Sequence, residues 1–369
     1  MFLQKLIVTN FKNYESQEIS FSEGINFITG NNGSGKTNLL DALHYLSLTK
    51  SAFMSQDVQT IKHGESFFVV NGIIKADNEQ FQILCSLEQG QKKSFKVNKK
   101  PYDRLSEHIG RFPLVLITPY DTDLIREGSE GRRKFIDSNI SQIHSSYLQE
   151  LIRYNEALRC RNILLKQFSD SRKPDYDLLD IYSKNLLHSG RLIYKWRQEF
   201  TKEFVPLFIK HYQNLTEGRE LPAIVYSSKL EEYNFEQGFQ DALQKDLALQ
   251  RTTLGIHKDD FIFTLDNHSL KNYGSQGQQK SFVIALKLAQ YEIIKKSKSI
   301  KPFLLLDDIF DKLDGVRIKK LMAMVAENTF GQLFITDARA ERIKKFLDPT
   351  KTKITIFHIE NGNLAEVND

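Results

Sequence analysis

The sequence that decides the expected fold is GNNGSGKT, Gly30 to Thr37. A short apolar run at 25–28 precedes it, and a helix-like stretch at 38–43 follows it. A strand, a glycine-rich loop and a helix in this order are typical of a phosphate-binding loop. Glycines let the backbone wrap tightly around an oxyanion, and the N–H groups at the start of the helix can hold a β-phosphate. The alternative is a glycine-rich turn before an ordinary helix.

Two side chains of this loop have distinct predicted roles. Lys36 would reach the β- and γ-phosphates, and Thr37 would offer its hydroxyl to Mg²⁺. Every residue of the loop is a predicted nucleotide contact: Gly30, Asn31, Asn32, Gly33, Ser34, Gly35, Lys36 and Thr37.

The composition is that of a globular protein, since 40% of the residues are apolar and 26% are charged. A length of 369 residues gives room for two domains or lobes. The formal charge of +5 permits a polyanionic partner without requiring one. Two cysteines, Cys85 and Cys160, imply neither a disulfide framework nor a metal cluster. No apolar run is long enough to span a bilayer and no signal-peptide pattern is present, so we expect a cytoplasmic protein with no membrane partner.

A second part of the site is expected where an apolar strand, 303–306, ends in two acids. This is the pattern of a Walker B strand. Asp307 would bind Mg²⁺, directly or through water, and Asp308 would orient or deprotonate the attacking water. The predicted catalytic residues are therefore Asp308 and Lys36. Taken alone, two acids after a buried strand are also a common way for a strand to end at the surface.

A second anion site is expected at Ser-Gln-Gly-Gln, 275–278, because a serine, a glycine and a helix N-terminus suit a γ-phosphate. Its predicted contacts are Ser275, Gly277 and Gln278. One chain does not need two phosphate cradles for one nucleotide. We therefore expect two copies to face each other, each offering this segment to the phosphate loop of the other.

The segments between these motifs predict two further structures. The first is an antiparallel β layer, with strands at 67–70, 81–84 and 94–97 and a hairpin turn at 88–91. The second is a helical hairpin at 138–213 that breaks at 169–174. Lysines beside the turn could contact a nucleic-acid backbone, or they could mark a solvated edge strand. The arginines at 132–133 could face DNA or phosphate, or pair with Asp137 and Glu130. The predicted DNA contacts are Lys92, Lys93, Lys96, Arg132 and Arg133.

The ordered set of motifs resembles the RecF family of ABC-type ATPases, which is related to the SMC and Rad50 heads. The resemblance runs nearly end to end, and Leu313-Asp314 matches the D-loop of the superfamily. The second acid is Asp308 where most ABC ATPases have glutamate, and Thr336 or Asp337 stands where many carry a switch histidine. The matching segments are 5–14, 30–38, 117–119, 132–137, 255–260, 275–280 and 304–314. In 255–260, His257 is a candidate for nucleotide or dimer contact or for simple packing beside Asp259.

The resemblance implies an α/β fold, a P-loop NTPase of ABC-ATPase head type with an antiparallel β layer and a helical arm lobe. The expected ATPase lobe is 1–137 with 291–369, and the expected arm lobe is 138–290. The implied cofactors are ATP and Mg²⁺. The implied partners are a second copy bound in an ATP-dependent manner, gapped, junction or duplex DNA, and recombination mediator proteins such as RecR. The implied activity is slow, DNA-stimulated ATP hydrolysis in single-strand gap repair, recombinase loading, replication and SOS induction.

Three other functions fit parts of the pattern. A transporter ATPase subunit would lack the helical insertion at 138–213. An SMC-like head or nuclease regulator would be expected to carry a longer arm. A P-loop kinase would need no second anion site from another copy.

Overall fold

Strand β3 (Ile25–Thr29), which leads into the glycine-rich loop, lies inside a six-stranded sheet of order β15-β14-β3-β13-β12-β8. The sheet is parallel from β14 to β8, and only β15 runs antiparallel. Every residue of β3, β12 and β13 is buried, as expected for parallel strands covered on both faces. The other strands are β8 (Leu114–Ile117), β12 (Phe303–Asp307), β13 (Leu333–Asp337), β14 (Ile354–Glu360) and β15 (Asn363–Asn368). The predicted apolar strands before both motifs are confirmed.

The computed structural model describes residues 1–168, 175–231, 235–309, 315–326, 329–339, 341 and 354–368. The predicted helix break at 169–174 and the D-loop pair Leu313-Asp314 lie outside these ranges.

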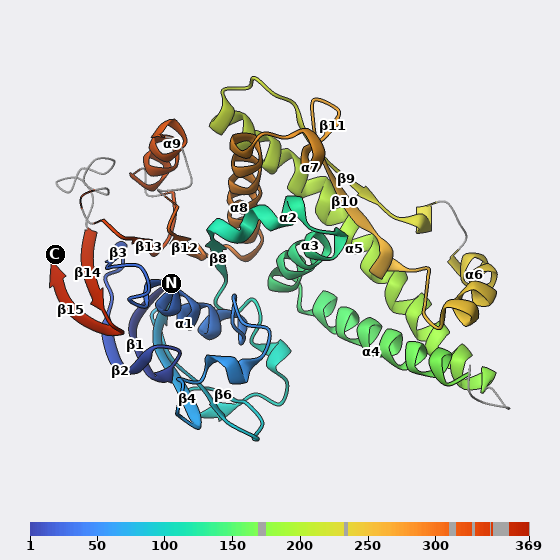
Figure 1. The fold of residues 1–369 in the computed structure, drawn as a ribbon, viewed down its shortest axis with the longest axis horizontal. Helices are drawn as coiled ribbons and strands as arrows, with labels where there is room; N and C mark the ends of the chain where they lie inside the picture. Colours follow the sequence, from blue (N-terminus) through green and yellow to red (C-terminus); the bar gives the residue numbers. More distant parts are fainter. Residues whose placement is uncertain are drawn as a thin grey trace. The chain divides into compact units, whose positions relative to one another are not determined.

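Helix α1 (Lys36–Leu48) contacts both sheets of its unit (Figure 1). It is buried at every position from 39 to 47, as expected of a helix covered on both sides. Its buried apolar side chains are Leu39, Leu40, Ala42, Leu43, Tyr45 and Leu46. Because α1 is held on both sides, the loop before it has a rigid support.

The second sheet is the predicted antiparallel layer, with the order β2-β1-β4-β5-β6-β7. Inward residues alternate with outward ones along its strands. Its turn after β5 is closed by Gln91 N–H donating to the Glu88 carbonyl at 3.0 Å, as predicted. The strands are β1 (Phe2–Phe11), β2 (Tyr14–Ser20), β4 (Phe67–Ala76), β5 (Glu79–Glu88), β6 (Ser94–Val97) and β7 (Lys100–Pro101). Phe11, Tyr45 and Phe68 meet edge to face in the core beneath it.

The chain divides into two compact units. Unit 1 holds Met1–Thr122, His211–Gly218 and Gln276–Asp369, and unit 2 holds Asp123–Lys210 and Arg219–Ser275. These boundaries differ from the predicted 137 and 290. Helix α3 (Ser129–Ile143) lies wholly in unit 2, because it packs on α4 and β10. Helix α8 (Gln276–Lys298) lies in unit 1, because it packs on β8.

Unit 2 is built mainly from long helices and one small sheet of order β11-β10-β9. Other helices in the described part of the chain are α2 (Asp123–Arg126), α4 (Ser145–Phe168), α5 (Tyr176–Thr216), α6 (Phe235–Leu249), α7 (Leu270–Tyr273) and α9 (Gly315–Ala326). The small sheet has β9 (Pro222–Ser227), β10 (Asp260–Leu265) and β11 (His268–Ser269). Single 3₁₀ turns are η1 (Asp57–Thr60), η2 (Leu105–Glu107), η3 (Pro119–Thr122), η4 (Lys229–Glu231) and η5 (Ile256–Lys258).

Candidate nucleotide site

The glycine-rich loop joins β3 to α1 and has a backbone that only glycine accepts at two positions. Gly30 and Gly35 have φ angles of 148° and 119°. A Cβ on Gly30 would lie 2.2 Å from the Ile359 carbonyl oxygen, and one on Gly35 would lie 2.7 Å from Asn13 Nδ2. These glycines therefore allow the close approach that a phosphate loop needs.

The Lys36 side chain closes over this loop. Its Nζ donates to the carbonyls of Gly30 at 2.7 Å and Asn31 at 2.9 Å. Burial lowers the pKa of Lys36, while the charges of Asp308 and Asp307 oppose that shift. The amine is thus held among acceptors at the mouth of the loop, which is where an incoming phosphate would replace them.

The acidic strand meets the loop at Thr37. Its hydroxyl donates to Asp307 Oδ1 and Oδ2, both at 3.0 Å, and the Thr336 hydroxyl donates to Asp307 Oδ1 at 2.7 Å. Burial raises the pKa of Asp307, and these two hydroxyl donors oppose the shift. A hydroxyl and a carboxylate at this spacing are the oxygen ligands that Mg²⁺ prefers beside nucleotide phosphates.

Asp308 follows Asp307 directly and takes a left-handed backbone, with φ of 46°. Its N–H donates to the Thr336 hydroxyl at 3.0 Å, so Thr336 links both acids. Of the two residues predicted at the switch position, Thr336 contacts the acids, and Asp337 accepts the N–H of Arg339 at 2.7 Å.

The predicted second anion site lies at the start of α8. Ser275 directly precedes this helix, and Ser275 and Gln276 are exposed. Gly277 and Gln278 lie in the first turn, where Gly277 O accepts from the Ser281 hydroxyl at 2.9 Å. The helix N-terminus is therefore open to solvent, as contact with a second copy would require.

Lys93, a predicted DNA contact, is instead tied into unit 1. Its Nζ donates to the Thr49 carbonyl at 2.6 Å, pairs with Asp57 at 2.5 Å and lies over the Tyr45 ring. Its side chain is 12% exposed. Lys92 remains exposed, and Lys96 is half-buried on β6.

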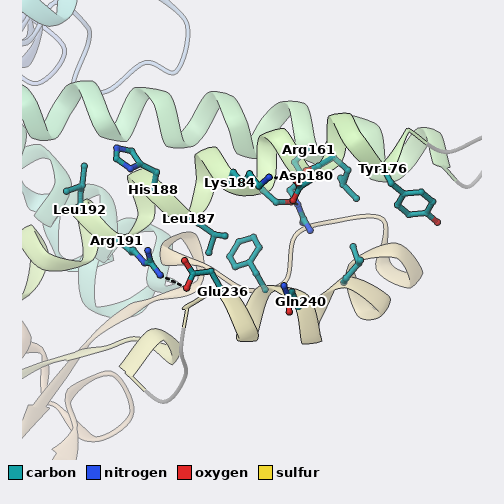
Figure 2. Close-up of a pocket in the computed structure, with 14 residues that line it drawn as sticks. Arg161, Tyr176, Asp180, Lys184, Leu187, His188, Arg191, Leu192, Glu236 and Gln240 are labelled. Atoms are coloured by element: carbon teal, nitrogen blue, oxygen red, sulfur yellow. Dashed lines mark hydrogen bonds and ion pairs between the residues drawn. The ribbon is translucent and has the colours of Figure 1, made fainter.

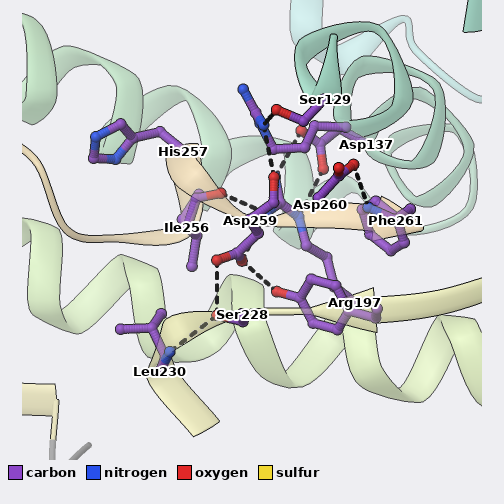
Figure 3. Close-up of polar contacts among 12 residues, drawn as sticks. Ser129, Asp137, Arg197, Ser228, Leu230, Ile256, His257, Asp259, Asp260 and Phe261 are labelled. Carbon is purple, nitrogen blue, oxygen red and sulfur yellow. Dashed lines mark hydrogen bonds and ion pairs between the residues drawn. The ribbon is translucent and has the colours of Figure 1, made fainter. Parts of the chain in front are cut away.

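Arg132 and Arg133 make ion pairs and hydrogen bonds within unit 2, although with partners other than the two that were expected. Arg132 binds both carboxylate oxygens of Asp260, at 2.8 and 2.9 Å. Arg133 donates to the Ser129 hydroxyl and the Asp259 carbonyl, both at 2.6 Å. Figure 3 shows three of their partners, Ser129, Asp259 and Asp260, in a polar cluster.

Arg197 is the centre of this cluster, and nothing in the sequence pattern singled it out. Its side chain is 1% exposed and it donates to both oxygens of Asp137, to Asp259 and to the Ile256 carbonyl (Figure 3). Tyr226 and Ser228 donate to Asp259 as well. Arg197 thereby joins α3, α5, β9 and the segment at 255–260.

His257 has the packing role that was one of its two alternatives. Its ring nitrogens contact the Tyr154 hydroxyl at 2.7 Å and the Thr252 carbonyl at 3.1 Å. Burial lowers the pKa of His257 to about 4, so the ring is neutral at physiological pH. The segment 255–260 is therefore held by contacts inside unit 2.

A cavity of about 560 Å³ lies between α5 and α6 in unit 2 (Figure 2). The arginines and the lysine of its lining are paired with acids: Arg161 with Asp246, Lys184 with Asp180, and Arg191 with Glu236. Because these charges are neutralised, the cavity has none of the character of a phosphate site.

Comparison with known proteins gives one consistent family. The model of the RecF/RecN/SMC N terminal domain matches residues 2–364. The DNA replication and repair protein RecF of Cytophaga hutchinsonii is 48% identical over 366 residues, covering 99% of this chain and 97% of the relative. RecF of Flavobacterium johnsoniae is 48% identical over 359 residues, covering 97% of this chain and all of the relative.

Solved structures agree. The recombination mediator protein RecF with ATP, described as part of the RecFOR pathway, has a TM-score of 0.88 and 30% identity, with 100% of this chain and 97% of that chain covered. An Smc head bound to the C-winged helix domain of ScpA has a TM-score of 0.57, 16% identity and coverage of 100% and 97%, and supports the fold alone. Within the described ranges, no helix combines the length and apolar character needed to cross a bilayer. The chain belongs to the RecF family of DNA replication and repair proteins, whose head is an ABC-type ATPase.

Proposed function

We propose that this protein is an ATP-gated, dimeric DNA-binding switch of recombinational repair and replication. The observation that carries the proposal is the junction of the phosphate loop with the acidic strand at Thr37 and Asp307. The RecF relatives and the ATP-bound RecF structure support ATP as the nucleotide.

Each residue of the junction has a place in hydrolysis. Lys36 would leave the Gly30 and Asn31 carbonyls and bind the β- and γ-phosphates. Thr37 and Asp307 would hold Mg²⁺, which neutralises phosphate charge when it is bound. Asp308 would orient the attacking water and take its proton. Because aspartate is one methylene shorter than the usual glutamate, we expect slow hydrolysis.

Dimerisation would complete the site. The exposed N-terminus of α8, with Ser275, Gly277 and Gln278, would bind the γ-phosphate held by the other copy. ATP would then join the two copies, and hydrolysis would let them separate.

DNA would be bound mainly through its phosphates, and binding would fall steeply with salt. Since Lys93, Arg132 and Arg133 are committed to contacts inside the chain, the remaining candidates among the predicted set are Lys92 and Lys96. DNA-stimulated turnover, mediator partners such as RecR, gap repair and SOS induction belong to the same proposal.

The test is ATP turnover at several protein concentrations, with and without gapped or duplex DNA. We expect a DNA-stimulated rate that rises more than linearly with protein concentration. A rate that is linear in protein and indifferent to DNA would instead favour a transporter subunit or a monomeric kinase. Lys36→Met is the inactive control, and Lys62→Met, which removes a pair with Glu15 away from the loop, is the matched control.

A further inference from the structure

The turn between β1 and β2 contacts the phosphate loop through side chains that have no assigned role. Asn13 Nδ2 donates to the Ser34 carbonyl at 2.9 Å, and the Tyr14 hydroxyl donates to the Gly35 carbonyl at 2.9 Å. Asn13 is half-buried and Tyr14 is fully buried. The sequence pattern marked this segment only as part of a family resemblance.

The Asn13 carboxamide is also held from the other side. Asn38 Nδ2, in the first turn of α1, donates to Asn13 Oδ1 at 2.7 Å. Because a backbone carbonyl can only accept, the contact with Ser34 identifies which end of the Asn13 amide carries the hydrogens. Asn13 thus links the middle of the loop to the helix that follows it.

The Ser34 carbonyl accepts a second hydrogen bond from the turn between β14 and β15, where Gly362 N–H donates at 2.8 Å. Both acceptor positions of this oxygen are then used. A Cβ on Gly362 would lie 2.6 Å from the Asn13 carbonyl oxygen, so the two turns also pack closely against each other.

Anchoring these carbonyls determines where the loop N–H groups point. A trans peptide is planar, and its C=O and N–H point in opposite directions. Fixing the Ser34 carbonyl toward Asn13 and Gly362 therefore directs the Gly35 N–H away from them. Fixing the Gly35 carbonyl toward Tyr14 likewise directs the Lys36 N–H away from Tyr14. These are amides at the helix N-terminus, where a phosphate binds.

We propose that Asn13 is a positioning residue that holds the phosphate loop in its nucleotide-binding shape before nucleotide arrives. Tyr14 and Gly362 support it in this role. The consequence for ATP binding rests on the proposed function, whereas the consequence for the loop itself does not. Because the amides in question serve the β-phosphate, the effect on ATP and on ADP is the same.

The test compares Asn13→Ala and Asn13→Asp with wild type. Both remove the donor to Ser34, and Asn13→Asp keeps the size and the acceptor toward Asn38. Asn10→Ala is the control, since Asn10 is an asparagine near the same end of β1 whose side chain donates to Glu65, at 3.3 Å, and not to the loop.

The first readout is amide hydrogen exchange of the segment 30–38 without nucleotide. We expect faster exchange there in both Asn13 variants, with unchanged exchange in the other strands of the parallel sheet and in Asn10→Ala. The second readout is equilibrium binding of ATP and ADP. We expect both nucleotides to bind about fivefold more weakly to each Asn13 variant, because one hydrogen bond is lost. The kcat of ATP hydrolysis should change little.

Unchanged exchange in 30–38 would overturn the proposal. So would weaker binding confined to Asn13→Asp, since that would mean the added charge, and not the lost donor, is responsible. Failure of wild type itself to bind ATP would refute the proposed function, and the exchange measurement would still decide the role of Asn13. Tyr14→Phe, which keeps the buried ring, supplies the same exchange test if either Asn13 variant does not fold.

Discussion

The Thr37 hydroxyl lies 3.0 Å from both carboxylate oxygens of Asp307, although 270 residues separate them in the chain. The contact follows from the strand order, because β13 lies between β3 and β12 and all three are parallel. Loops that follow parallel strands meet at the same edge of a sheet, where ligands bind. The two motifs therefore form one site.

Thr336→Val tests how Asp307 is held. Valine keeps the volume of the buried side chain and suits a strand, but it removes the donor to Asp307 and the acceptor for Asp308 N–H. Losing a donor to a carboxylate raises its pKa further and weakens its hold on a cation. We expect about a tenfold higher Mg²⁺ requirement in a titration of ATP hydrolysis, with ATP binding without metal unchanged. An unchanged Mg²⁺ requirement would remove Thr336 from the site.

Asp308→Asn tests the proposed base. The substitution keeps the size of the side chain and removes its ability to accept a proton. We expect turnover to fall by about 10² or more, as for other general bases, while the ATP-bound dimer persists in light scattering. Undiminished turnover would exclude Asp308 from the mechanism, and a loss of ATP binding would mean that its role is structural.

The strands, the glycine-rich loop and the acids could be predicted because each is a pattern of consecutive residues. The partners of Lys93, Arg132 and Arg197 could not, because they depend on which distant acid the fold brings within reach. Lys93 belonged to a lysine run that resembled a DNA-binding edge, yet Asp57 and the Thr49 carbonyl bind it. The contact of Asn13 with Ser34 was hidden for the same reason, since a short polar turn gives no periodic signal.

Arg197→Met tests the cluster in unit 2. Removing this buried cation leaves Asp137 and Asp259 close together without their shared partner. Breaking a buried ion pair costs about 3 to 5 kcal/mol, so we expect a decrease of that size in the free energy of unfolding in urea. Lys195→Met, on the exposed face of the same helix, is the control and should change it by less than about 0.5 kcal/mol. Equal effects in both variants would contradict the assignment.

His108 makes stability depend on pH. Its Nε2 donates to the Leu46 carbonyl at 2.7 Å, and burial lowers the pKa of His108 to about 4 from its usual 6.5. The unfolded chain therefore binds a proton that the folded chain rejects between pH 6.5 and 4. Stability should fall by about 3 kcal/mol across that interval on acidification.

His108→Gln should flatten this part of the profile in urea unfolding between pH 7 and 4. His63→Gln, at an exposed position, is the matched control and should leave the profile unchanged. His257 contributes a fall of the same sign, so some slope remains in the His108 variant. An identical slope in wild type and His108→Gln would show that His108 is not the source.

The most direct test of the sandwich mixes two defective copies. Lys36→Met spoils the phosphate loop and keeps the start of α8, whereas Ser275→Arg does the reverse, so a mixed dimer holds one intact composite site. One variant carries a donor dye and the other an acceptor dye, and both are mixed at concentrations well above that at which wild type associates. We expect ATP-dependent energy transfer between them. The matched control mixes Lys36→Met with the double variant Lys36→Met/Ser275→Arg, which offers no intact site. Energy transfer no greater than in this control, while wild type pairs normally, would contradict a site shared between two copies.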